Sequence, residues 1–303
     1  MIAILLCTLN GEDFILDQLN SIKNQTYKNF DLYIKENFSK DCTKKIIDKF
    51  KIENPEVSIK YLKGDSDHFA NSYIKGLNQI TNAYSYFAFC DQDDIWETYH
   101  LERSIKYLKK YSNKPSVYSS RTTLINHQGK IIGKSLYFKR PPSFQNALAQ
   151  SIAGANTMVF NLKALNLIKK INLNKHVVSH DWLLYILVTA NAGHFFYDLE
   201  PSVKYRQHEN NFIGSNLGFI SSLKRLILML KGRFRFYNIN NIEHLDDLDI
   251  IEEENIETFI NYKKSIYKKK YKRPYFLIKS KVYRQSFLGN IALLINIFFD
   301  NKY

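Results

Sequence analysis

The first 90 residues alternate between short apolar runs and segments with helical spacing, and this alternation constrains the fold more than any other feature. The apolar runs predict strands at residues 1–7, 30–34, 57–62 and 84–90. The segments between them predict helices at residues 14–23, 43–50 and 71–80. Strands that alternate with helices pair in parallel, because the helix returns the chain to the same end of the sheet. We therefore expect an α/β fold with a parallel sheet and helices on both faces.

Polar clusters follow three of these predicted strands. They are Thr8 to Glu12 after the first strand, Glu36-Asn37 after the second and Asp91 to Asp94 after the fourth. Ligands of open α/β sheets bind outside the carboxyl ends of the strands. We expect the three clusters to converge on one edge of the sheet.

Asp91, Gln92, Asp93 and Asp94 form the most acidic of these clusters. Neighbouring carboxylates raise each other's pKa unless a cation neutralises them. Hard oxygens suit Mg²⁺ or Mn²⁺, which hold few protein ligands and complete their shell with substrate phosphates and water. Alternatively, Asp93 or Asp94 caps a helix that begins near Ile95. Taken alone, the cluster does not decide between a metal site and a helix cap.

The middle of the chain predicts a change of architecture. A helix is expected beyond Trp96 to about Tyr111. Residues 116–125 and 130–132 flank a Gln128-Gly129 turn and predict an antiparallel insertion.

Further candidate residues surround a helical run at residues 182–192, which Gly193 closes. Asp181 at its start suits either a first-turn charge or a general base that takes a proton from a sugar hydroxyl. His208 is a candidate third metal ligand, or an ordinary polar histidine. Arg206 has the fork geometry that holds phosphate, although most arginines are merely solvated.

Size and composition limit the class of protein. The 303 residues suffice for one large domain and an extension. With 45% hydrophobic and 24% charged residues, the chain is neither globally disordered nor collagen-like. Its three cysteines lack metal-ligand spacing, which predicts neither a disulfide framework nor a zinc site and favours the cytoplasm. The apolar start lacks a basic leader and is interpreted as a buried strand.

The basic charge concentrates in the C-terminal part. The chain has a net charge of +14, and residues 215–303 hold 16 Lys or Arg against 9 Asp or Glu. Residues 219–236 have a basic amphipathic pattern, whereas the apolar run 287–299 is shorter than a membrane span. We expect a catalytic domain at 1–214 and a mainly helical extension at 215–303. The extension is predicted to bind an anionic membrane surface or to mediate homodimerisation.

Seven motifs in order resemble glycosyltransferase family 2, and more narrowly its rhamnosyltransferase-like bacterial branch. The motifs are Thr8-Leu9-Asn10-Gly11-Glu12, Leu19-Asn20-Ser21-Ile22-Lys23-Asn24-Gln25-Thr26-Tyr27, Phe69-Ala70-Asn71, Phe89-Cys90-Asp91-Gln92-Asp93-Asp94-Ile95-Trp96, Gly154-Ala155-Asn156-Thr157-Met158, His180-Asp181-Trp182 and Tyr205-Arg206-Gln207-His208-Glu209-Asn210-Asn211. The resemblance covers residues 1 to about 214.

This resemblance implies a GT-A fold, a Rossmann-like mixed sheet, and an inverting, metal-dependent transfer from a nucleoside diphosphate sugar. It implies that Asp93 and His208 hold Mn²⁺ or Mg²⁺, that Asp181 is the base, and that His180 and Trp182 contact the acceptor. The implied donor contacts are Thr8, Asn10, Glu12, Glu36, Asn37, Asn71, Asp91, Gln92, Gly154 and Arg206.

One departure concerns the nucleotide. The family usually carries paired aspartates after the second strand, where this chain reads Lys35-Glu36-Asn37. Glu36 or the Asn37 carbonyl oxygen could accept the pyrimidine N3–H, so UDP- and dTDP-linked donors both remain open.

The expected reaction moves a hexose or deoxyhexose onto a bacterial surface polysaccharide or a lipid-linked oligosaccharide. Rhamnose is the first choice of sugar, followed by galactose or glucose. The enzyme would act in the cytoplasm, on the inner face of the membrane. A nucleotidyltransferase is the alternative enzyme, although the glycine-rich phosphate loop is missing. A basic nucleic-acid-binding protein is the non-enzymatic alternative, but no such motif appears, and no nucleic-acid partner is expected.

Overall fold

The computed structural model describes residues 1–65, 67–208 and 234–299. Four strands form the parallel part of its sheet, in the order β3-β2-β1-β4. They are β1 (Ile2–Thr8), β2 (Phe30–Glu36), β3 (Ile59–Leu62) and β4 (Tyr86–Cys90). Helices α1 (Ile15–Lys23), α2 (Thr43–Glu53) and α3 (Phe69–Gln79) connect them. The alternation predicted for the first 90 residues is confirmed.

The sheet continues beyond β4 with mixed pairing. Strand β8 (Val159–Asn161) runs antiparallel to β4 and to β6 (Ser116–Ile125). Strand β9 (His194–Arg206) is parallel to β6, and β5 (Ile95–Trp96) is antiparallel to β9. Strand β7 (Ile131–Lys134) forms an antiparallel hairpin with β6. The expected antiparallel insertion is therefore wrong for β6, which lies within the main sheet.

Helices of the middle segment connect and cover these strands. They are α4 (His100–Leu108), α5 (Phe144–Ala147), α6 (Leu162–Ile168) and α7 (His180–Ala190), with short 3₁₀ turns η1 (Lys109–Tyr111) and η2 (Ala155–Thr157). Gly193 ends the α7 region because its N–H donates to the Val188 carbonyl, and an added Cβ would lie 2.5 Å from the Pro115 carbonyl oxygen.

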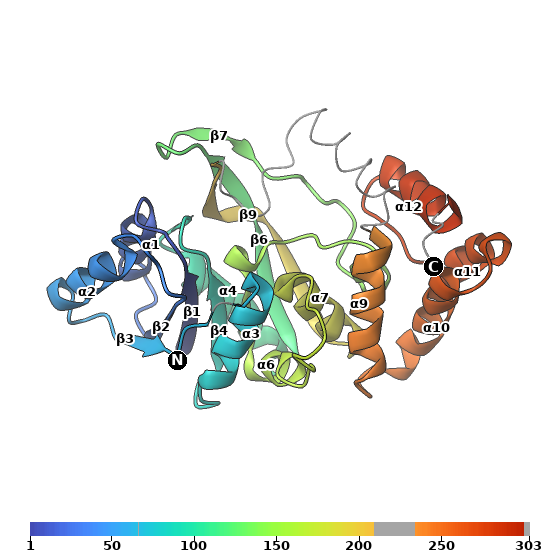
Figure 1. Ribbon diagram of the computed structural model, residues 1–303, viewed down its shortest axis with the longest axis horizontal. Helices are drawn as coiled ribbons and strands as arrows, with labels where there is room; N and C mark the ends of the chain where they lie inside the picture. The colour runs from blue at the N-terminus through green and yellow to red at the C-terminus, as the bar shows by residue number, and fades with distance from the viewer. Residues whose placement is uncertain (66, 209–233, 300–303) are drawn as a thin grey trace.

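Successive side chains of the strands point to opposite faces and build two cores. In β1, Ile4 and Leu6 pack with α1, α2 and α4, whereas Ala3 and Leu5 pack with α3, α6 and α7. All four side chains are fully buried. Helices thus cover both faces of the sheet, as Figure 1 shows.

The C-terminal helices pack onto the second of these cores. They are α9 (Phe234–Asp246), α10 (Glu253–Tyr267), η4 (Lys270–Lys272), α11 (Arg273–Ser280) and α12 (Phe287–Phe299). Phe234, Ile242 and Tyr262 join the core that contains α7. The Asn255 amide donates to the carbonyls of Thr189 and Ala190, both at 3.1 Å. The predicted helical extension is present and anchored to α7 (Figure 1). The predicted boundary at 214/215 and most of the predicted helix 219–236 lie outside the described residues.

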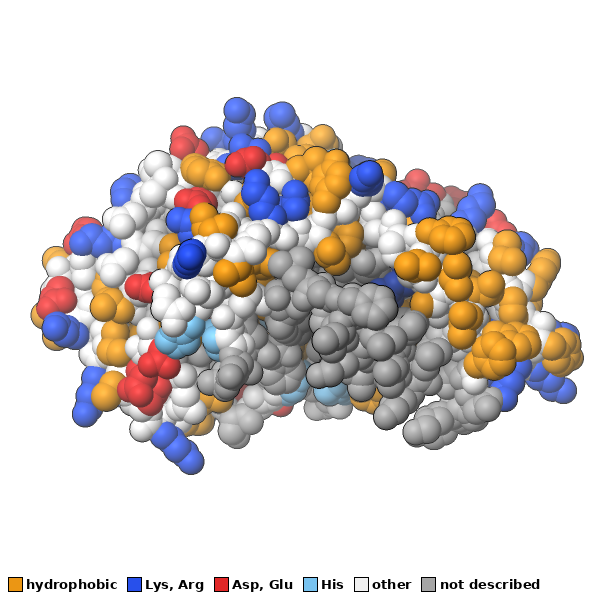
Figure 2. Space-filling model, turned by 90° about the horizontal axis from the view of Figure 1, so that it is seen from above, with side chains coloured by type: hydrophobic (Ala, Val, Ile, Leu, Met, Phe, Trp, Pro, Cys, Tyr) orange, Lys and Arg blue, Asp and Glu red, His pale blue; other side chains and the backbone are white. Residues whose placement is uncertain are grey.

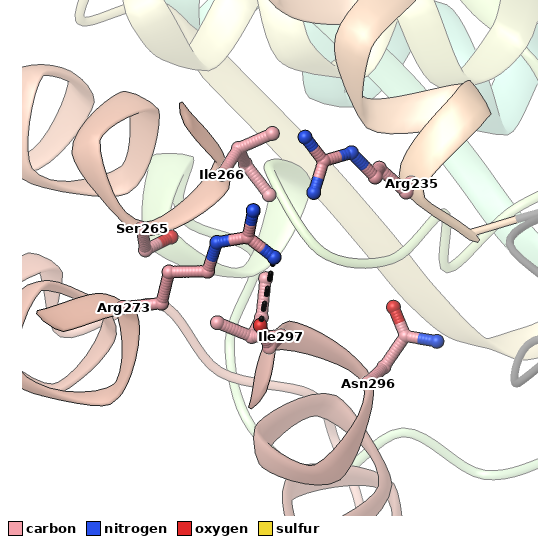
Figure 3. Close-up of a pocket in the computed structure, with 6 residues that line it drawn as sticks. All are labelled: Arg235, Ser265, Ile266, Arg273, Asn296 and Ile297. Carbon is pink, nitrogen blue, oxygen red and sulfur yellow. Dashed lines mark hydrogen bonds between the residues drawn. The ribbon is translucent and has the colours of Figure 1, made fainter. Parts of the chain in front are cut away.

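Two buried arginines lie where the four C-terminal helices meet. Figure 3 shows Arg235 of α9 and Arg273 of α11 lining a pocket with Ser265 of α10 and Asn296 of α12. Arg273 Nη1 donates to the Ile297 carbonyl at 3.5 Å, which links α11 to α12. None of the predicted site residues lines this pocket.

The described residues 1–65, 67–208 and 234–299 include no helix that is long and apolar enough to cross a membrane.

Candidate active site at the strand ends

The polar clusters after β1, β2 and β4 meet at one edge of the sheet, as predicted. The Thr8 hydroxyl donates to Gln92 Oε1 at 2.6 Å, and the Leu9 N–H donates to the same oxygen at 2.9 Å. The Asn37 N–H donates to the Thr8 carbonyl at 3.0 Å. Gln92 thus joins the loop after β4 to the loop after β1.

Asn10 and Glu12 fasten the loop after β1 to the loop before α2. Asn10 Oδ1 accepts from the Lys40 N–H at 2.9 Å, and Glu12 Oε2 accepts from the Cys42 N–H at 2.8 Å. Asn10 adopts a φ of 49°, a left-handed conformation that asparagine tolerates well. Both side chains shape the rim of the predicted donor site through protein contacts.

Glu36 and Asn37, at the position of the family's paired aspartates, also accept hydrogen bonds from the protein. Glu36 accepts from the backbone N–H groups of Phe38 and Ser39 at 3.2 and 2.6 Å. Asn37 Oδ1 accepts from Lys35 Nζ and from the Asp65 N–H, both at 3.1 Å. Lys35 is buried beneath the site and pairs with Asp65 at 2.7 Å. To accept a hydrogen bond from a pyrimidine N3–H, Glu36 or Asn37 would have to share a side-chain oxygen with these protein donors.

Asp91 lies at the centre of the acidic cluster. The Tyr73 hydroxyl donates to Asp91 Oδ1 at 2.6 Å. Burial, followed by the charge of Asp93, raises the pKa of Asp91 to about 7, and the charge of Asp181 acts in the same direction. The site therefore concentrates negative charge that a cation would relieve.

Asp93 and His208 are in direct contact. Asp93 Oδ2 lies 2.8 Å from His208 Nε2, and the His208 ring packs on Phe14 with centroids 5.0 Å apart. Among residues 1–65, 67–208 and 234–299, no three His, Cys, Asp or Glu side chains gather as a ready metal cage. The Asp93 carboxylate nevertheless suits Mn²⁺ or Mg²⁺, which complete their coordination with phosphate oxygens and water, and the His208 imidazole lies where it could add a nitrogen ligand.

Asp94 has a structural position that the sequence did not indicate. Its side chain is fully buried and accepts from Asn156 Nδ2 at 2.5 Å and from the Arg206 N–H at 3.0 Å. Burial raises its pKa well above the ordinary value, with smaller contributions from Asp93 and Asp91. The helix-cap alternative is wrong, because β5 follows this cluster and α4 begins only at His100.

Arg206 holds the acidic loop in place and does not present an open fork to a phosphate. It is 2% exposed, and its Nε donates to the Asp93 carbonyl at 2.9 Å. Its two Nη atoms donate to the His127 carbonyl at 2.7 Å and to Asp17 at 2.8 Å. This geometry differs from the predicted donor contact. The sequence could not predict this structural role, because all three hydrogen-bond partners of Arg206 are distant in sequence.

Asp181 lies in the first turn of α7, beside the Gly154 loop. Its Oδ1 accepts from the Trp182 N–H at 2.7 Å and from the Ser179 hydroxyl. It is 8% exposed, and burial raises its pKa. Asp181 also accepts a hydrogen bond from the Ala155 N–H, which places it beside η2. The charge of Asp181 contributes to raising the pKa of Asp91. The first-turn interpretation is therefore compatible with a carboxylate beside the acidic cluster, and the base role stays a prediction.

His180 and Trp182 are packed inside the protein. His180 is 2% exposed and stacks on Tyr73 with ring centroids 4.2 Å apart. Burial lowers its pKa to about 3. Trp182 Nε1 donates to the Ala147 carbonyl at 2.7 Å. Neither ring therefore lies on an open acceptor surface. The sequence could not predict this, because every residue of α7 is buried and its periodicity marks no exposed face.

Two further predicted donor contacts border the site. Asn71 Nδ2 donates to Asp67 at 3.3 Å, while its buried Oδ1 has no hydrogen-bond partner. Gly154 immediately precedes η2, and an added Cβ there would lie 2.7 Å from Asn156 Oδ1. A side chain at Gly154 would therefore disturb the asparagine that holds Asp94. Tyr73, which contacts Asp91, was not predicted, because its place on α3 resembles that of a core residue.

Comparison with known proteins gives consistent matches. The family described as Glycosyl transferase family 2 matches residues 3–159. The dTDP-rhamnosyl transferase RfbG of Shigella flexneri is 30% identical over 76% of this chain and 81% of its own length. The Escherichia coli UDP-Glc:alpha-D-GlcNAc-diphosphoundecaprenol beta-1,3-glucosyltransferase WfgD is 27% identical over 75% of this chain and 77% of its own. Among solved structures, Staphylococcus aureus TarS 1-349 with UDP-GlcNAc has a TM-score of 0.58 at 16% identity, covering 93% of this chain and 81% of its own.

Proposed function

The chain is a member of glycosyltransferase family 2 with a GT-A fold, and we propose that it transfers a deoxyhexose or hexose from a nucleoside diphosphate sugar with inversion. Rhamnose is the first choice of sugar, because the relative RfbG carries a dTDP-rhamnosyl transferase name. Galactose and glucose follow. Family membership replaces the nucleotidyltransferase and the nucleic-acid-binding protein as interpretations of the acidic cluster and of the basic charge.

The contact between Asp93 and His208, at the same strand edge as Asp91, is the observation that carries this proposal. These two residues would hold Mn²⁺ or Mg²⁺. A bound divalent cation supplies Lewis-acid stabilisation of the charge that develops on a leaving diphosphate. Arg206 fixes the position of Asp93 by donating a hydrogen bond to the Asp93 backbone carbonyl. The protein therefore positions the carboxylate through the chain as well as through the side chain.

In the proposed reaction Asp181 acts as the general base. Its carboxylate takes the proton of an acceptor hydroxyl as that oxygen forms a bond to the anomeric carbon. The bond from that carbon to the diphosphate oxygen breaks, and the electron pair leaves with the nucleoside diphosphate. One displacement from the opposite side inverts the anomeric centre. The Ser179 and Trp182 hydrogen bonds orient the Asp181 carboxylate at the start of α7.

We propose the nucleotide of the donor and the acceptor as chemical classes. UDP-linked and dTDP-linked donors both suit a pyrimidine site rimmed by Glu36 and Asn37. The name of WfgD specifies a diphosphoundecaprenol-linked acceptor, which supports a lipid-linked oligosaccharide or a surface polysaccharide as acceptor here. We place the enzyme in the cytoplasm, peripherally on the inner face of the membrane. The C-terminal helices would provide the attachment, with homodimerisation as the second role for them.

A thermal-shift panel tests the donor and the metal together. We expect dTDP-rhamnose or a UDP-sugar to raise the unfolding temperature only when Mn²⁺ is present, because a ligand that binds the folded state stabilises it. Asp93→Ala should abolish that shift. Asp249→Ala, at an exposed aspartate between α9 and α10, is the matched control and should retain it. Equal donor shifts with and without Mn²⁺ in the wild type would rule out the metal assignment.

A further inference from the structure

Helix α12 exposes a continuous apolar side. Its outward side chains recur with the spacing of one helical face and are between 39% and 79% exposed. We call this surface the α12 apolar face; it consists of Phe287, Leu288, Ile291, Leu294, Ile295, Phe298 and Phe299. Figure 2 shows hydrophobic side chains gathered over the C-terminal helices, on a face that also carries histidine and acidic side chains at the opposite end.

The inward side of α12 is less apolar than its outward side. Leu293 and Ile297 are buried, with 1% and 3% of their surface exposed. Asn296 is buried beside them and is 3% exposed. None of the 13 residues of α12 is charged. A soluble helix normally directs its polar residues outward, so this distribution is inverted. Contiguous apolar surface of this kind marks a contact with another molecule.

The surroundings of α12 favour an anionic lipid surface as that molecule. Exposed lysines precede the helix at Lys270, Lys272 and Lys281, whereas Lys279 pairs with Glu257 at 3.5 Å. Tyr271 is 69% exposed, and tyrosine is favoured where hydrocarbon meets water. A bilayer with anionic headgroups complements both the hydrocarbon and the cations, whereas a second copy of this basic chain would bring like charges together.

The length of α12 determines how it can meet a bilayer. Thirteen helical residues extend about 20 Å, which is less than the roughly 30 Å of a bilayer's hydrocarbon core. The helix therefore suits a position in the plane of the interface, with one side in the headgroup and acyl boundary.

We propose that the α12 apolar face docks on an anionic bilayer surface, and so holds the enzyme where lipid-linked acceptors reside. The proposal rests on the proposed function for the acceptor class. It assigns the membrane contact to α12, within the extension 215–303 that the sequence predicted to bind a membrane surface or to mediate homodimerisation.

Vesicle binding of the full chain tests this assignment. Leu288→Glu combined with Ile295→Glu introduces charge at two exposed positions, and should weaken partition onto phosphatidylglycerol and phosphatidylcholine vesicles at least tenfold. Ile52→Glu, on α2 and 80% exposed, is the matched control and should bind like the wild type. Vesicles of phosphatidylcholine alone should bind the wild type several-fold more weakly. Turnover on a soluble acceptor should stay within twofold for all variants.

Three outcomes would overturn the proposal. The first is unchanged partition of the double variant, and the second is equal binding to neutral and anionic vesicles. The third is a change from dimer to monomer in light scattering with vesicle binding intact, which would assign the face to a second copy. Loss of turnover in every protein, wild type included, would instead contradict the proposed reaction and leave the vesicle result standing.

Discussion

The strand-end site and helix α12 depart from the usual division of polar and apolar groups in opposite directions. At the site, Asp94 is fully buried and Asp181 is 8% exposed. On α12, Phe287 and Leu288 are 79% and 75% exposed. Burying carboxylates and exposing hydrocarbon both cost free energy in the isolated chain. We propose that each region binds a partner of a different kind, a cation with donor phosphates at the site and lipid at α12.

The largest effect should come from removing the proposed base. Asp181→Asn should lower kcat by roughly 10²- to 10⁴-fold, the usual contribution of general base catalysis. Asparagine retains an oxygen for the Trp182 N–H, so the start of α7 should remain intact. Donor binding, measured by thermal shift with Mn²⁺, should be unchanged.

The pH profile adds a second measurement on the same residue. Burial raises the pKa of Asp181, and the carboxylate must be ionised to accept a proton. We therefore expect kcat to fall as pH is lowered through a value above the ordinary aspartate range. Wild-type turnover in Asp181→Asn would remove the base assignment and leave Asp181 as a first-turn residue.

Two leucines of α12 sharpen the contrast between its inner and outer sides. Leu293→Ala removes a side chain that is 1% exposed and should lower the free energy of unfolding by about 2–5 kcal/mol. Leu288→Ala, at 75% exposure, should change it by less than about 0.5 kcal/mol. Urea unfolding measures both. Comparable losses would mean that the α12 apolar face is covered in solution.

An effect that depends on pH concerns a buried histidine beside the site. Both ring nitrogens of His180 lack a hydrogen-bond partner, and burial lowers its pKa to about 3. Between pH 6.5 and 3 the unfolded chain binds a proton that the folded chain excludes, so stability falls as pH falls. The slope per histidine is about 1.4 kcal/mol per pH unit. The free energy of unfolding of His180→Phe should therefore fall less steeply between pH 6.5 and 3 than that of the wild type, by the slope of one histidine.

Activity of the same variant tests the acceptor interpretation. If His180 serves only packing on Tyr73, acceptor KM should stay near the wild-type value. A KM increase above tenfold with unchanged stability would return His180 to the acceptor site.

The sequence predicted the elements that local periodicity defines. Strands and helices up to Cys90 and the meeting of Thr8, Asn37 and Gln92 followed from alternation and from parallel pairing. The contact of Asp93 with His208 was expected from the family resemblance. These successes share a feature: a pattern within a few residues, or a motif in a known order, specified the outcome.

The failures depend on partners far along the chain. Residues 116–125 carry the same strand pattern whether they form an insertion or, as β6, pair in parallel with β9. Asp94 looks like a helix cap until β5 forms on β9. Arg206 looks like a phosphate ligand until Asp17 and the Asp93 carbonyl engage it. Burial at each of these positions is a property of the assembled sheet.

The role of β9 also has a consequence for the order of synthesis. The Asp94 carboxylate leaves the ribosome 112 residues before the Arg206 N–H that binds it, and Asp93 precedes His208 by 115 residues. At about 5–20 residues per second, the acidic loop waits roughly 6–23 s for its partners. A nascent chain that ends before β9 therefore has strands and helices but no assembled Asp93 and His208 contact. Catalytic competence should be among the last properties that the growing chain acquires.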